Sequence, residues 1–391
     1  MSVLAQMSLL AQGAAAVLFA THTLQLGTAL VAVRRLRRGA ATEAPSPARP
    51  PAPPISIILP VTQLDYAAEQ TLSSVFRLSG TIFEILICVP DEGDESVPLI
   101  RALMSRHGGV PARLLVGRDR LSSNPKLDNM EKGWVACRYD WIVIADANVL
   151  LPPDGLLRLL SVWDHDTGLA CSPPVGTQPL SFAGEIECAF LNTYQARLQL
   201  AADSLGSGFA HGKVMMFRRS LLDDCGGMRG LSFEVAEDSA ATKVVRRQGL
   251  RVRLTDRPFG QPVGPRRLSQ VWHRHLRWAQ LRRQSFPLHY AAEFLTTSLT
   301  PLAAAIVLAG ELGLSRAGLG SASLGLWLTV EGGMAVAAGW TFRLRYLPAC
   351  FCRDVLIAAI WPIAWFRNRY VWRGNKIAMK AETNRQKTAA S

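Results

Sequence analysis

The stretch Trp141-Ile142-Val143-Ile144-Ala145-Asp146-Ala147-Asn148 decides how this chain is expected to fold. An apolar run of strand character ends on an aspartate, and a second polar residue follows two places later. In open α/β folds, ligands bind outside the carboxyl ends of the strands. The stretch therefore predicts a strand over residues 141–145 that presents Asp146 and Asn148 at a binding edge.

Strand and helix patterns alternate along the chain on both sides of this stretch. Further runs of strand character are Ile55–Leu59, Phe83–Val89 and Ala112–Val116. Segments of helical period, at residues 67–78 and 98–106, lie between them. Such alternation predicts an α/β domain whose sheet is mostly parallel and covered by helices on both faces. We place this domain at residues 55–293.

The composition points to a membrane rather than to nucleic acid. Of the 391 residues, 49% are hydrophobic, and the net charge is +13. The mean hydropathy of +0.14 is high for a chain with 19% charged residues. The arginines cluster beside apolar segments, and no basic module interleaved with aromatics, as in RNA-binding proteins, is present. The cysteines lack zinc-site spacing, which indicates buried thiols in a reducing compartment. We therefore expect no nucleic-acid partner.

Residues 1–33 contain no Asp, Glu, Lys or Arg, and four of the next five residues are arginines. The run is long enough to span a bilayer. No positive region precedes it, so we predict an uncleaved transmembrane anchor rather than a signal peptide. An amphipathic surface helix is the alternative, but the run has no charged face. Arginines after a span place the next domain in the cytoplasm. Residues 34–54 read as a basic, Pro/Ala-rich linker.

Apolar segments return near the C-terminus. Residues 294–310 and 318–342 are long enough to be two spans, whereas residues 355–366 are too few and predict an interfacial or re-entrant segment. Two spans would return the chain to the cytoplasmic side, where the basic tail at 367–391 belongs. We therefore predict a multi-pass membrane protein.

Three charged groups have the residue types that phosphate and proton chemistry need. Asp146 suits a divalent cation, although a strand-end aspartate also caps turns. Lys126, in an Asn-Pro loop ahead of a helix, suits a phosphate, although single lysines are usually solvated. Asp238, beside Glu237, suits a general base, although acids are also favoured in the first turn of a helix.

A basic and aromatic cluster follows in a helix predicted over residues 268–285. Arg274 and Arg277 share a helix face, and Trp278 lies one turn from Arg274. One arginine would neutralise a leaving phosphate and Trp278 would line an acceptor site. The helix as a whole also has the composition of an interfacial helix.

In their order, these motifs resemble the ceramide glucosyltransferase family, over roughly residues 55–295. The resemblance rests on Asn124-Pro-Lys-x-x-Asn129, Asp146, Glu237-Asp238 and Arg274-x-x-Arg277-Trp278, with Asp91 as an earlier aspartate. Segments around Cys171 and Cys188 look like the bacterial branch, which implies a bacterial inner membrane.

The resemblance implies a GT-A-type fold with a mixed, mostly parallel sheet. It also implies inverting transfer of a sugar, glucose first, from a UDP-sugar to the primary hydroxyl of ceramide. The nucleotide sugar would contact Asp91, Lys126, Asn129 and Asp146, with Mg²⁺ or Mn²⁺ on Asp146. Asp238 would be the base, and Arg274, Arg277 and Trp278 would serve the acceptor and the diphosphate.

Two segments depart from the family pattern. The second motif reads Asp146-Ala-Asn148, so Asn148 supplies an oxygen but no negative charge. The segment Phe209–Lys213 differs from the Thr-Gly-x-Ser pattern of animal relatives. UDP-glucuronate, UDP-galactose and a hopanoid-type lipid therefore stay open. A processive polysaccharide synthase and a non-enzymatic membrane scaffold are the alternatives from other classes.

Overall fold

The structure is a computed structural model that describes residues 7–41, 51–119, 122, 124–367, 369–372 and 375–378 of the chain. Two compact units are distinguished. Unit 1 comprises residues 1–37, 179–198 and 265–370, and unit 2 comprises residues 38–178, 199–264 and 371–391. The predicted linker is described only at its two ends, and most of the predicted basic tail lies outside the described residues.

Unit 2 is built on a seven-stranded sheet with the order β3-β2-β1-β4-β7-β5-β8. Its strands are β1 (Ile55–Pro60), β2 (Phe83–Val89), β3 (Ala112–Val116), β4 (Trp141–Ala145), β5 (Thr167–Cys171), β7 (Val214–Arg218) and β8 (Arg251–Leu254). Strand β7 runs antiparallel to β4 and β5, and the other pairs are parallel. The predicted mixed, mostly parallel sheet is thus confirmed.

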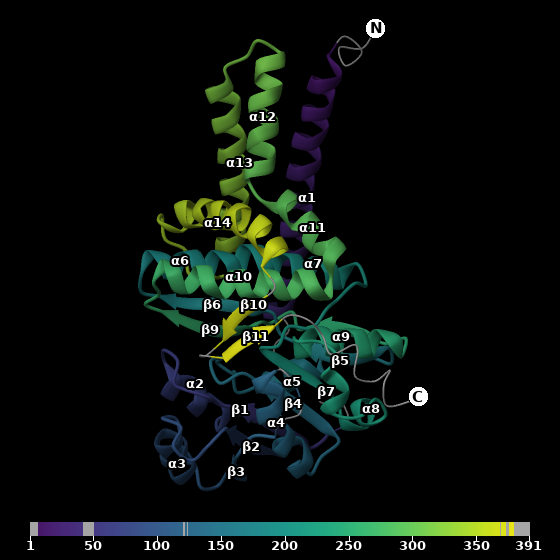
Figure 1. The fold of residues 1–391 in the computed structure, drawn as a ribbon, viewed down its shortest axis with the longest axis vertical. Helices are drawn as coiled ribbons and strands as arrows, with labels where there is room; N and C mark the ends of the chain where they lie inside the picture. Colours follow the sequence, from purple (N-terminus) through teal and green to yellow (C-terminus); the bar gives the residue numbers. More distant parts are fainter. Residues whose placement is uncertain are drawn as a thin grey trace. The chain divides into compact units, whose positions relative to one another are not determined.

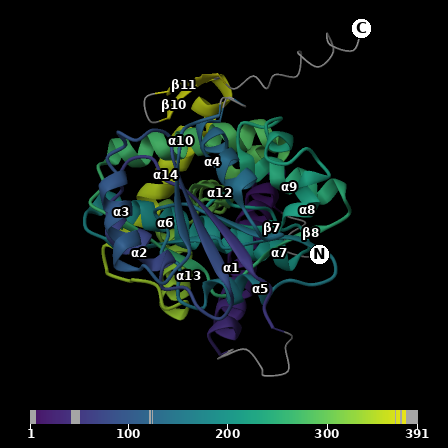
Figure 2. The same ribbon diagram turned by 90° about the horizontal axis from the view of Figure 1, so that it is seen from below.

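The helices of unit 2 cover this sheet. They are α2 (Ala68–Val75), α3 (Val97–Arg106), α4 (Pro125–Ala136), α5 (Gly155–Leu160), α8 (Arg219–Asp223), η3 (Arg229–Leu231) and α9 (Glu237–Arg247). Figure 2 shows α2 and α3 at one side of the strands and α8 and α9 at the other. A second, two-stranded sheet pairs β6 (Pro174–Pro179) with β9 (Phe259–Gly264). A third pairs β10 (Arg369–Trp372) with β11 (Asn375–Ala378).

The core of unit 2 fixes where the end of β4 lies. Ile142, Val143 and Ile144 are fully buried, as expected for a central strand covered on both faces. In the antiparallel ladder, Ala145 of β4 stands opposite Val214 at the start of β7. The residues after Ala145 and those before Val214 therefore meet at the same edge of the sheet.

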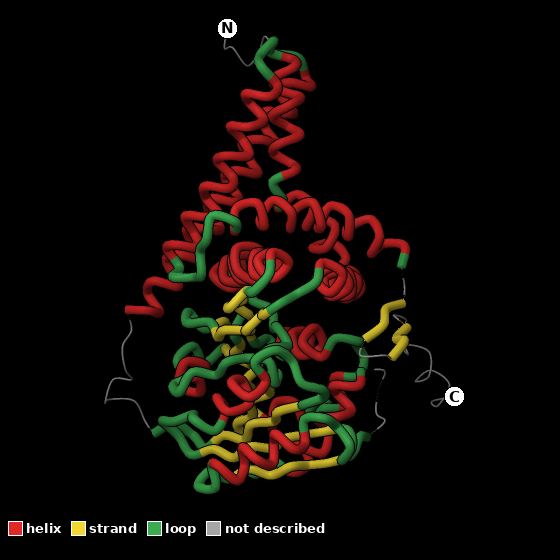
Figure 3. Tube along the Cα trace, turned by 90° about the vertical axis from the view of Figure 1, so that its left-hand side faces the viewer, coloured by secondary structure: helices red, strands yellow, loops and turns green. Residues whose placement is uncertain are grey.

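Unit 1 is largely helical, as the red segments in Figure 3 show. Its helices are α1 (Leu9–Ala41, whose last residues fall in unit 2), α6 (Phe182–Ala189), the π-helix η2 (Phe190–Ala196), α7 (Arg197–Ser204, mostly in unit 2), α10 (Leu268–Ser285), α11 (Pro287–Ala292), η4 (Glu293–Thr296), α12 (Leu299–Glu311), α13 (Arg316–Ala337) and α14 (Tyr346–Phe366). Figure 1 shows α12 and α13 side by side. Helix α10 has the bounds predicted for the interfacial helix, and its position at an interface stays a prediction.

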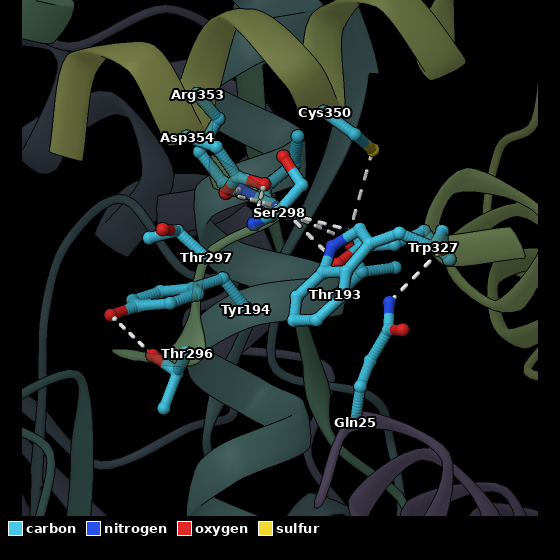
Figure 4. A network of polar contacts seen from close by, with 12 residues as sticks. Gln25, Thr193, Tyr194, Thr296, Thr297, Ser298, Trp327, Cys350, Arg353 and Asp354 are labelled. Carbon is cyan, nitrogen blue, oxygen red and sulfur yellow. Dashed lines mark hydrogen bonds and ion pairs between the residues drawn. The ribbon is translucent and has the colours of Figure 1, made fainter. Parts of the chain in front are cut away.

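Charged side chains are buried where α13, α14 and η2 of unit 1 meet (Figure 4). The guanidinium of Arg353 bonds Glu331 at 2.8 and 3.1 Å and Asp354 at 2.7 Å. It also donates to the hydroxyl of Thr193 at 3.1 Å. Asp354 in turn accepts a bond from the backbone N–H of Ser298 at 2.8 Å. The ion pairs compensate for removing these three charges from water.

The apolar helices of unit 1 differ in their bounds from the predicted segments. The predicted span at 294–310 is bent, because residues Pro287–Thr296 and Leu299–Glu311 meet at 54°. The segment predicted at 355–366 belongs to a longer helix, because α14 already begins at Tyr346 and includes the paired Arg353 and Asp354.

Among the described residues, two single helices are long and apolar enough to cross a membrane, namely α1 and α14, and the bent pair could form a third span. This corrects the expectation that the segment ending at Phe366 is too short to span. Helix α13, which contains most of the span predicted at 318–342, is not one of these candidate spans. The number of crossings, and therefore the side on which each terminus lies, stays a prediction.

Candidate functional site

Lys126 lies among carboxylates in unit 2. Its Nζ lies 2.7 Å from Oδ1 of Asp146 and 2.6 Å from Oε1 of Glu237. The carbonyl oxygen of Gly212 is a third acceptor at 2.7 Å. Burial alone would lower the pKa of Lys126, but the two carboxylates hold it well above its ordinary value. Lys126 is therefore a charged ammonium group with three acceptors for its three protons.

The start of α4 positions Lys126. Asn124 is the N-cap, and its Oδ1 accepts from the N–H groups of Lys126 at 2.9 Å and Leu127 at 3.3 Å. Pro125 follows at the first helical position, where no N–H is needed. The Nδ2 of Asn124 donates to Oε2 of Glu237 at 2.9 Å. One residue thus fixes both the helix start and the carboxylate that Lys126 contacts.

The second oxygen of Asp146 is bound by Lys213. The Nζ of Lys213 lies 2.8 Å from Oδ2 of Asp146 and 3.0 Å from Oδ1 of Asn148. The amide of Asn148 donates to Oδ2 of Asp65 at 2.8 Å. Burial would raise the pKa of Asp146, yet Lys126 and Lys213 hold it well below its ordinary value. The Asp146 carboxylate is therefore ionised, with an ammonium group on each oxygen.

Asp238 lies in the first turn of α9, as predicted. Its Oδ2 accepts from the backbone N–H of Gly212 at 2.9 Å, and its Oδ1 accepts from the N–H of Ser239 at 2.7 Å. Burial, and then the charge of neighbouring Glu237, raise the pKa of Asp238 to about 6. The residue is half-buried. A carboxylate with a pKa near neutrality suits proton transfer.

Gly212 is the point on which three of these groups converge. A Cβ atom at Gly212 would lie 2.9 Å from Oε1 of Glu237, 3.3 Å from Oδ2 of Asp238 and 3.5 Å from Nζ of Lys126. The structure therefore brings together Lys126, Asp146 and Asp238 from the predicted set, and adds Glu237 and Gly212 to them.

The residues around Asp146 do not form a protein cage for a resident Mg²⁺ or Mn²⁺. Hard cations take oxygen ligands, and Mg²⁺ is commonly held by one or two carboxylates together with substrate phosphates. Within the described ranges, no three His, Cys, Asp or Glu side chains lie close enough to hold a metal ion. Each oxygen of Asp146 faces an ammonium group, and the neighbouring Asn148 adds no charge.

Two other predicted residues lie apart from this group. Asn129 is 1% exposed, and its Nδ2 donates to the carbonyl oxygens of Cys88 at 2.8 Å and Val61 at 3.4 Å. Its Oδ1 accepts from Lys132 at 2.6 Å. Asn129 thus ties α4 to the ends of β1 and β2. Asp91 is exposed in the loop after β2. A role of either residue toward a nucleotide sugar stays a prediction.

In unit 1, Arg274 and Trp278 are in contact, as their spacing predicts. The guanidinium of Arg274 lies 5.1 Å from the centroid of the Trp278 ring. Arg274 also bonds the buried Glu187 at 2.9 Å, and Nε2 of His275 lies 3.1 Å from the same carboxylate. Burial would raise the pKa of Glu187, but Arg274 and His275 lower it to about 2. Arg277 is half-buried on the same helix. The acceptor and diphosphate roles of Arg274, Arg277 and Trp278 stay predictions.

Sequence reasoning missed Lys213 and Glu187 as partners of the predicted residues. Lys213 stands directly before the apolar residues of β7, which mirrors the place of Asp146 directly after β4. Its contact with Asp146 needs the antiparallel pairing of these strands, which a pattern of apolar residues does not reveal. Glu187 lies far from Arg274 in sequence and carries no motif of its own.

The chain resembles enzymes that transfer sugars. Over 253 residues it is 29% identical to ceramide glucosyltransferase 1 of Caenorhabditis elegans, an alignment that covers 64% of this chain and 54% of that protein. It is 25% identical over 237 residues to ceramide glucosyltransferase 3 of the same organism, with 60% and 52% covered. The chain thus spans about half the length of these relatives.

Among solved structures, the fold is similar to that of the mannosyltransferase PcManGT from Pyrobaculum calidifontis, determined in complex with GDP-Man and Mn²⁺. The TM-score is 0.53 at 19% identity, and the match covers 90% of this chain and 98% of that one. The predicted GT-A-like fold is thereby confirmed. The model of glycosyl transferase family 21 matches residues 17–385, nearly the whole chain. This protein therefore belongs to glycosyl transferase family 21.

Proposed function

We propose that this protein transfers a sugar from a UDP-sugar to the primary hydroxyl of ceramide or a related membrane lipid, with inversion. Glucose is the first candidate for the sugar. The family, the names of the similar proteins and the apolar helices of unit 1 support this proposal. The observation that carries it is Asp238, a half-buried carboxylate with a pKa of about 6 next to Glu237, whose carboxylate is paired with Lys126 and through Lys126 with Asp146.

Asp238 acts as the general base in this proposal. The hydroxyl oxygen of the lipid attacks the anomeric carbon of the sugar, and its proton passes to Oδ1 or Oδ2 of Asp238. The bond between the anomeric carbon and the diphosphate oxygen breaks, and UDP leaves with the electron pair. The N–H groups of Gly212 and Ser239 hold the carboxylate in one orientation throughout. A positioned base of this kind contributes a factor of roughly 10²–10⁴ to the rate.

The donor contacts the polar edge after β4. Lys126 offers a positive charge to the diphosphate, as lysine point charges do at many phosphate sites. We retain Asp91 and Asn129 as candidates for the nucleotide, on the strength of the family motif. A divalent cation such as Mg²⁺ or Mn²⁺ at Asp146 would share the two oxygens of this carboxylate with Lys126 and Lys213.

We further propose that the protein crosses the bacterial inner membrane more than once, with unit 2 in the cytoplasm. The support is the pair of long apolar helices and the arginines at residues 34–38, which follow the apolar part of α1. UDP-sugars are made in the cytoplasm, and a ceramide-like acceptor stays in the bilayer, so both substrates would be within reach.

The test is transfer by the purified full-length protein in lipid nanodiscs. The donors are UDP-glucose, UDP-galactose and UDP-glucuronate, the acceptors are ceramide and a hopanoid-type alcohol, and products are identified by mass spectrometry. We expect hexosylceramide from UDP-glucose. Transfer only to the hopanoid-type alcohol would mean that this lipid, and not ceramide, is the acceptor. A polymer of many sugars would favour a polysaccharide synthase. Folded protein that transfers no sugar from any donor would favour a non-enzymatic scaffold.

A further inference from the structure

The acidic motif after β4 carries only one negative charge. In Asp146-Ala147-Asn148, the second oxygen donor is an amide rather than a carboxylate. An amide oxygen is a weaker partner for a divalent cation than a carboxylate, because it brings no charge to offset that of the ion. It remains a good acceptor for an ammonium group. The pair of oxygens is therefore matched to a single positive charge.

Lys213 supplies that charge. Lys213 is only 6% exposed. Its Nζ lies between two oxygens and donates to Oδ2 of Asp146 at 2.8 Å and to Oδ1 of Asn148 at 3.0 Å. The backbone also holds the lysine, because its carbonyl oxygen accepts from the N–H of Asp146 at 2.8 Å. The ladder of β4 and β7 continues into this bond. Lys213 is thus fixed between the two oxygens by its main chain and its side chain together.

Both oxygens of Asp146 are already paired with ammonium groups. Lys213 lies on one oxygen, and Lys126, which Glu237 shares, lies on the other. A divalent cation placed on Asp146 would meet two ammonium groups bound to the same carboxylate. Like charges at such short range in a partly buried site repel strongly.

We propose that the Lys213 ammonium takes the place of a divalent cation between Asp146 and Asn148. Together with Lys126 it would place ammonium groups beside the diphosphate of the nucleotide donor, without a resident metal. This inference rests on the proposed function, and it names the nucleoside diphosphate as the ligand of Lys213. Lysine suits the task because it is a compact point charge that binds phosphate oxygens.

The direct test is binding of UDP to the full-length protein by isothermal titration calorimetry, after passage over a chelating resin and in EDTA. We expect wild-type protein to bind UDP with an affinity that added Mn²⁺ or Mg²⁺ changes by less than about threefold. Lys213→Met should weaken binding at least tenfold, because it keeps the length of the side chain and removes the charge. Lys243→Met, which breaks an ion pair of unit 2 with Glu234, is the matched control and should bind UDP normally.

A second variant tests whether a divalent cation can take the position of the Lys213 ammonium group. Lys213→Met combined with Asn148→Asp restores two carboxylates and removes the ammonium between them. We expect UDP binding by this double variant to depend on Mn²⁺, whereas the wild type does not. Sugar transfer in EDTA should fall roughly 10²–10³-fold in Lys213→Met, as when one preorganised group is removed from a site of developing charge.

Wild-type protein that binds UDP only with Mn²⁺ present would overturn this inference, and so would a Lys213→Met variant that binds UDP as tightly as the wild type in EDTA. Metal-independent UDP binding without transfer to any lipid would contradict the proposed function, while the assignment of Lys213 would stand.

Discussion

The backbone N–H of Gly212 donates to Oδ2 of Asp238 at 2.9 Å, and no side chain at residue 212 stands between the two. The same glycine accepts from Lys126 through its carbonyl oxygen. One peptide unit on each side of Gly212 thus joins the candidate base to the lysine that is paired with Asp146. The candidate base and the candidate phosphate-binding lysine are thus both bonded to Gly212 within unit 2.

Asp238→Asn tests the role of the base. The substitution keeps the size of the side chain and removes its capacity to accept a proton. Turnover should fall by roughly 10²–10⁴. UDP binding should change little, because the base serves the acceptor hydroxyl. Exposed Asp224, replaced by Asn, is the control. Near-normal turnover would leave Asp238 with a structural role in the first turn of α9, and Glu237 would be the next candidate.

The pH dependence of transfer follows from the raised pKa of Asp238. Above a pKa of about 6 the carboxylate is ionised and accepts the proton, and below it the protonated form cannot. The rate at low substrate concentration should therefore fall as the pH drops through about 6, with a slope of one proton. Rates measured from pH 5 to pH 8 would check this. A flat profile between pH 5 and pH 7 would speak against a base with this pKa.

Gly212→Ala tests the convergence of the charged groups. The added Cβ atom would lie 2.9 Å from Oε1 of Glu237, so this carboxylate must move and its pairing with Lys126 must loosen. We expect a loss of turnover of at least about tenfold with little loss of thermal stability. Gly109→Ala is the control, since a Cβ atom there meets nothing within 4 Å. Equal activity of Gly212→Ala and Gly109→Ala would contradict the expected clash between the added Cβ atom and Glu237.

Arg353→Met tests the ion cluster of unit 1. It removes the cation and leaves Glu331 and Asp354 buried without their shared partner. Breaking a buried ion pair on one side typically costs about 3–5 kcal/mol. Chemical denaturation of the purified protein should show a loss of that size in the free energy of unfolding. The exposed Arg316, replaced by Met, should have an effect under about 0.5 kcal/mol. Similar stabilities would mean that the cluster contributes nothing.

Local patterns were enough to predict most of the sheet before β7. The apolar runs at β2, β3 and β4 have the predicted bounds. Strands β2 and β4 are central and buried, and such strands are continuous hydrophobic segments, whereas β3 is an edge strand of the sheet. The direction of β7 could not be predicted in this way. It depends on pairing between residues far apart in sequence, such as Trp141 with Arg218.

The same limit applies to charge pairing. The sequence indicated Lys126, Asp146 and Asp238, but the ammonium of Lys213 on Asp146 arises only from the strand pairing. In unit 1, the charged residues Arg353 and Asp354 directly precede the apolar segment predicted at 355–366. Arg353 pairs with both Asp354 and Glu331, so α14 contains the two charged residues and is longer than hydropathy alone predicted.

The anomeric configuration of the product tests the proposed transfer with inversion. Wild-type protein would be incubated with UDP-glucose, whose sugar is α-linked, and ceramide, and the product's anomeric proton examined by NMR. We expect β-linked glucosylceramide from wild-type protein and none above background from Asp238→Asn. An α-linked product would contradict inversion by a single base. So would wild-type protein that binds UDP but transfers no sugar to ceramide or any related lipid.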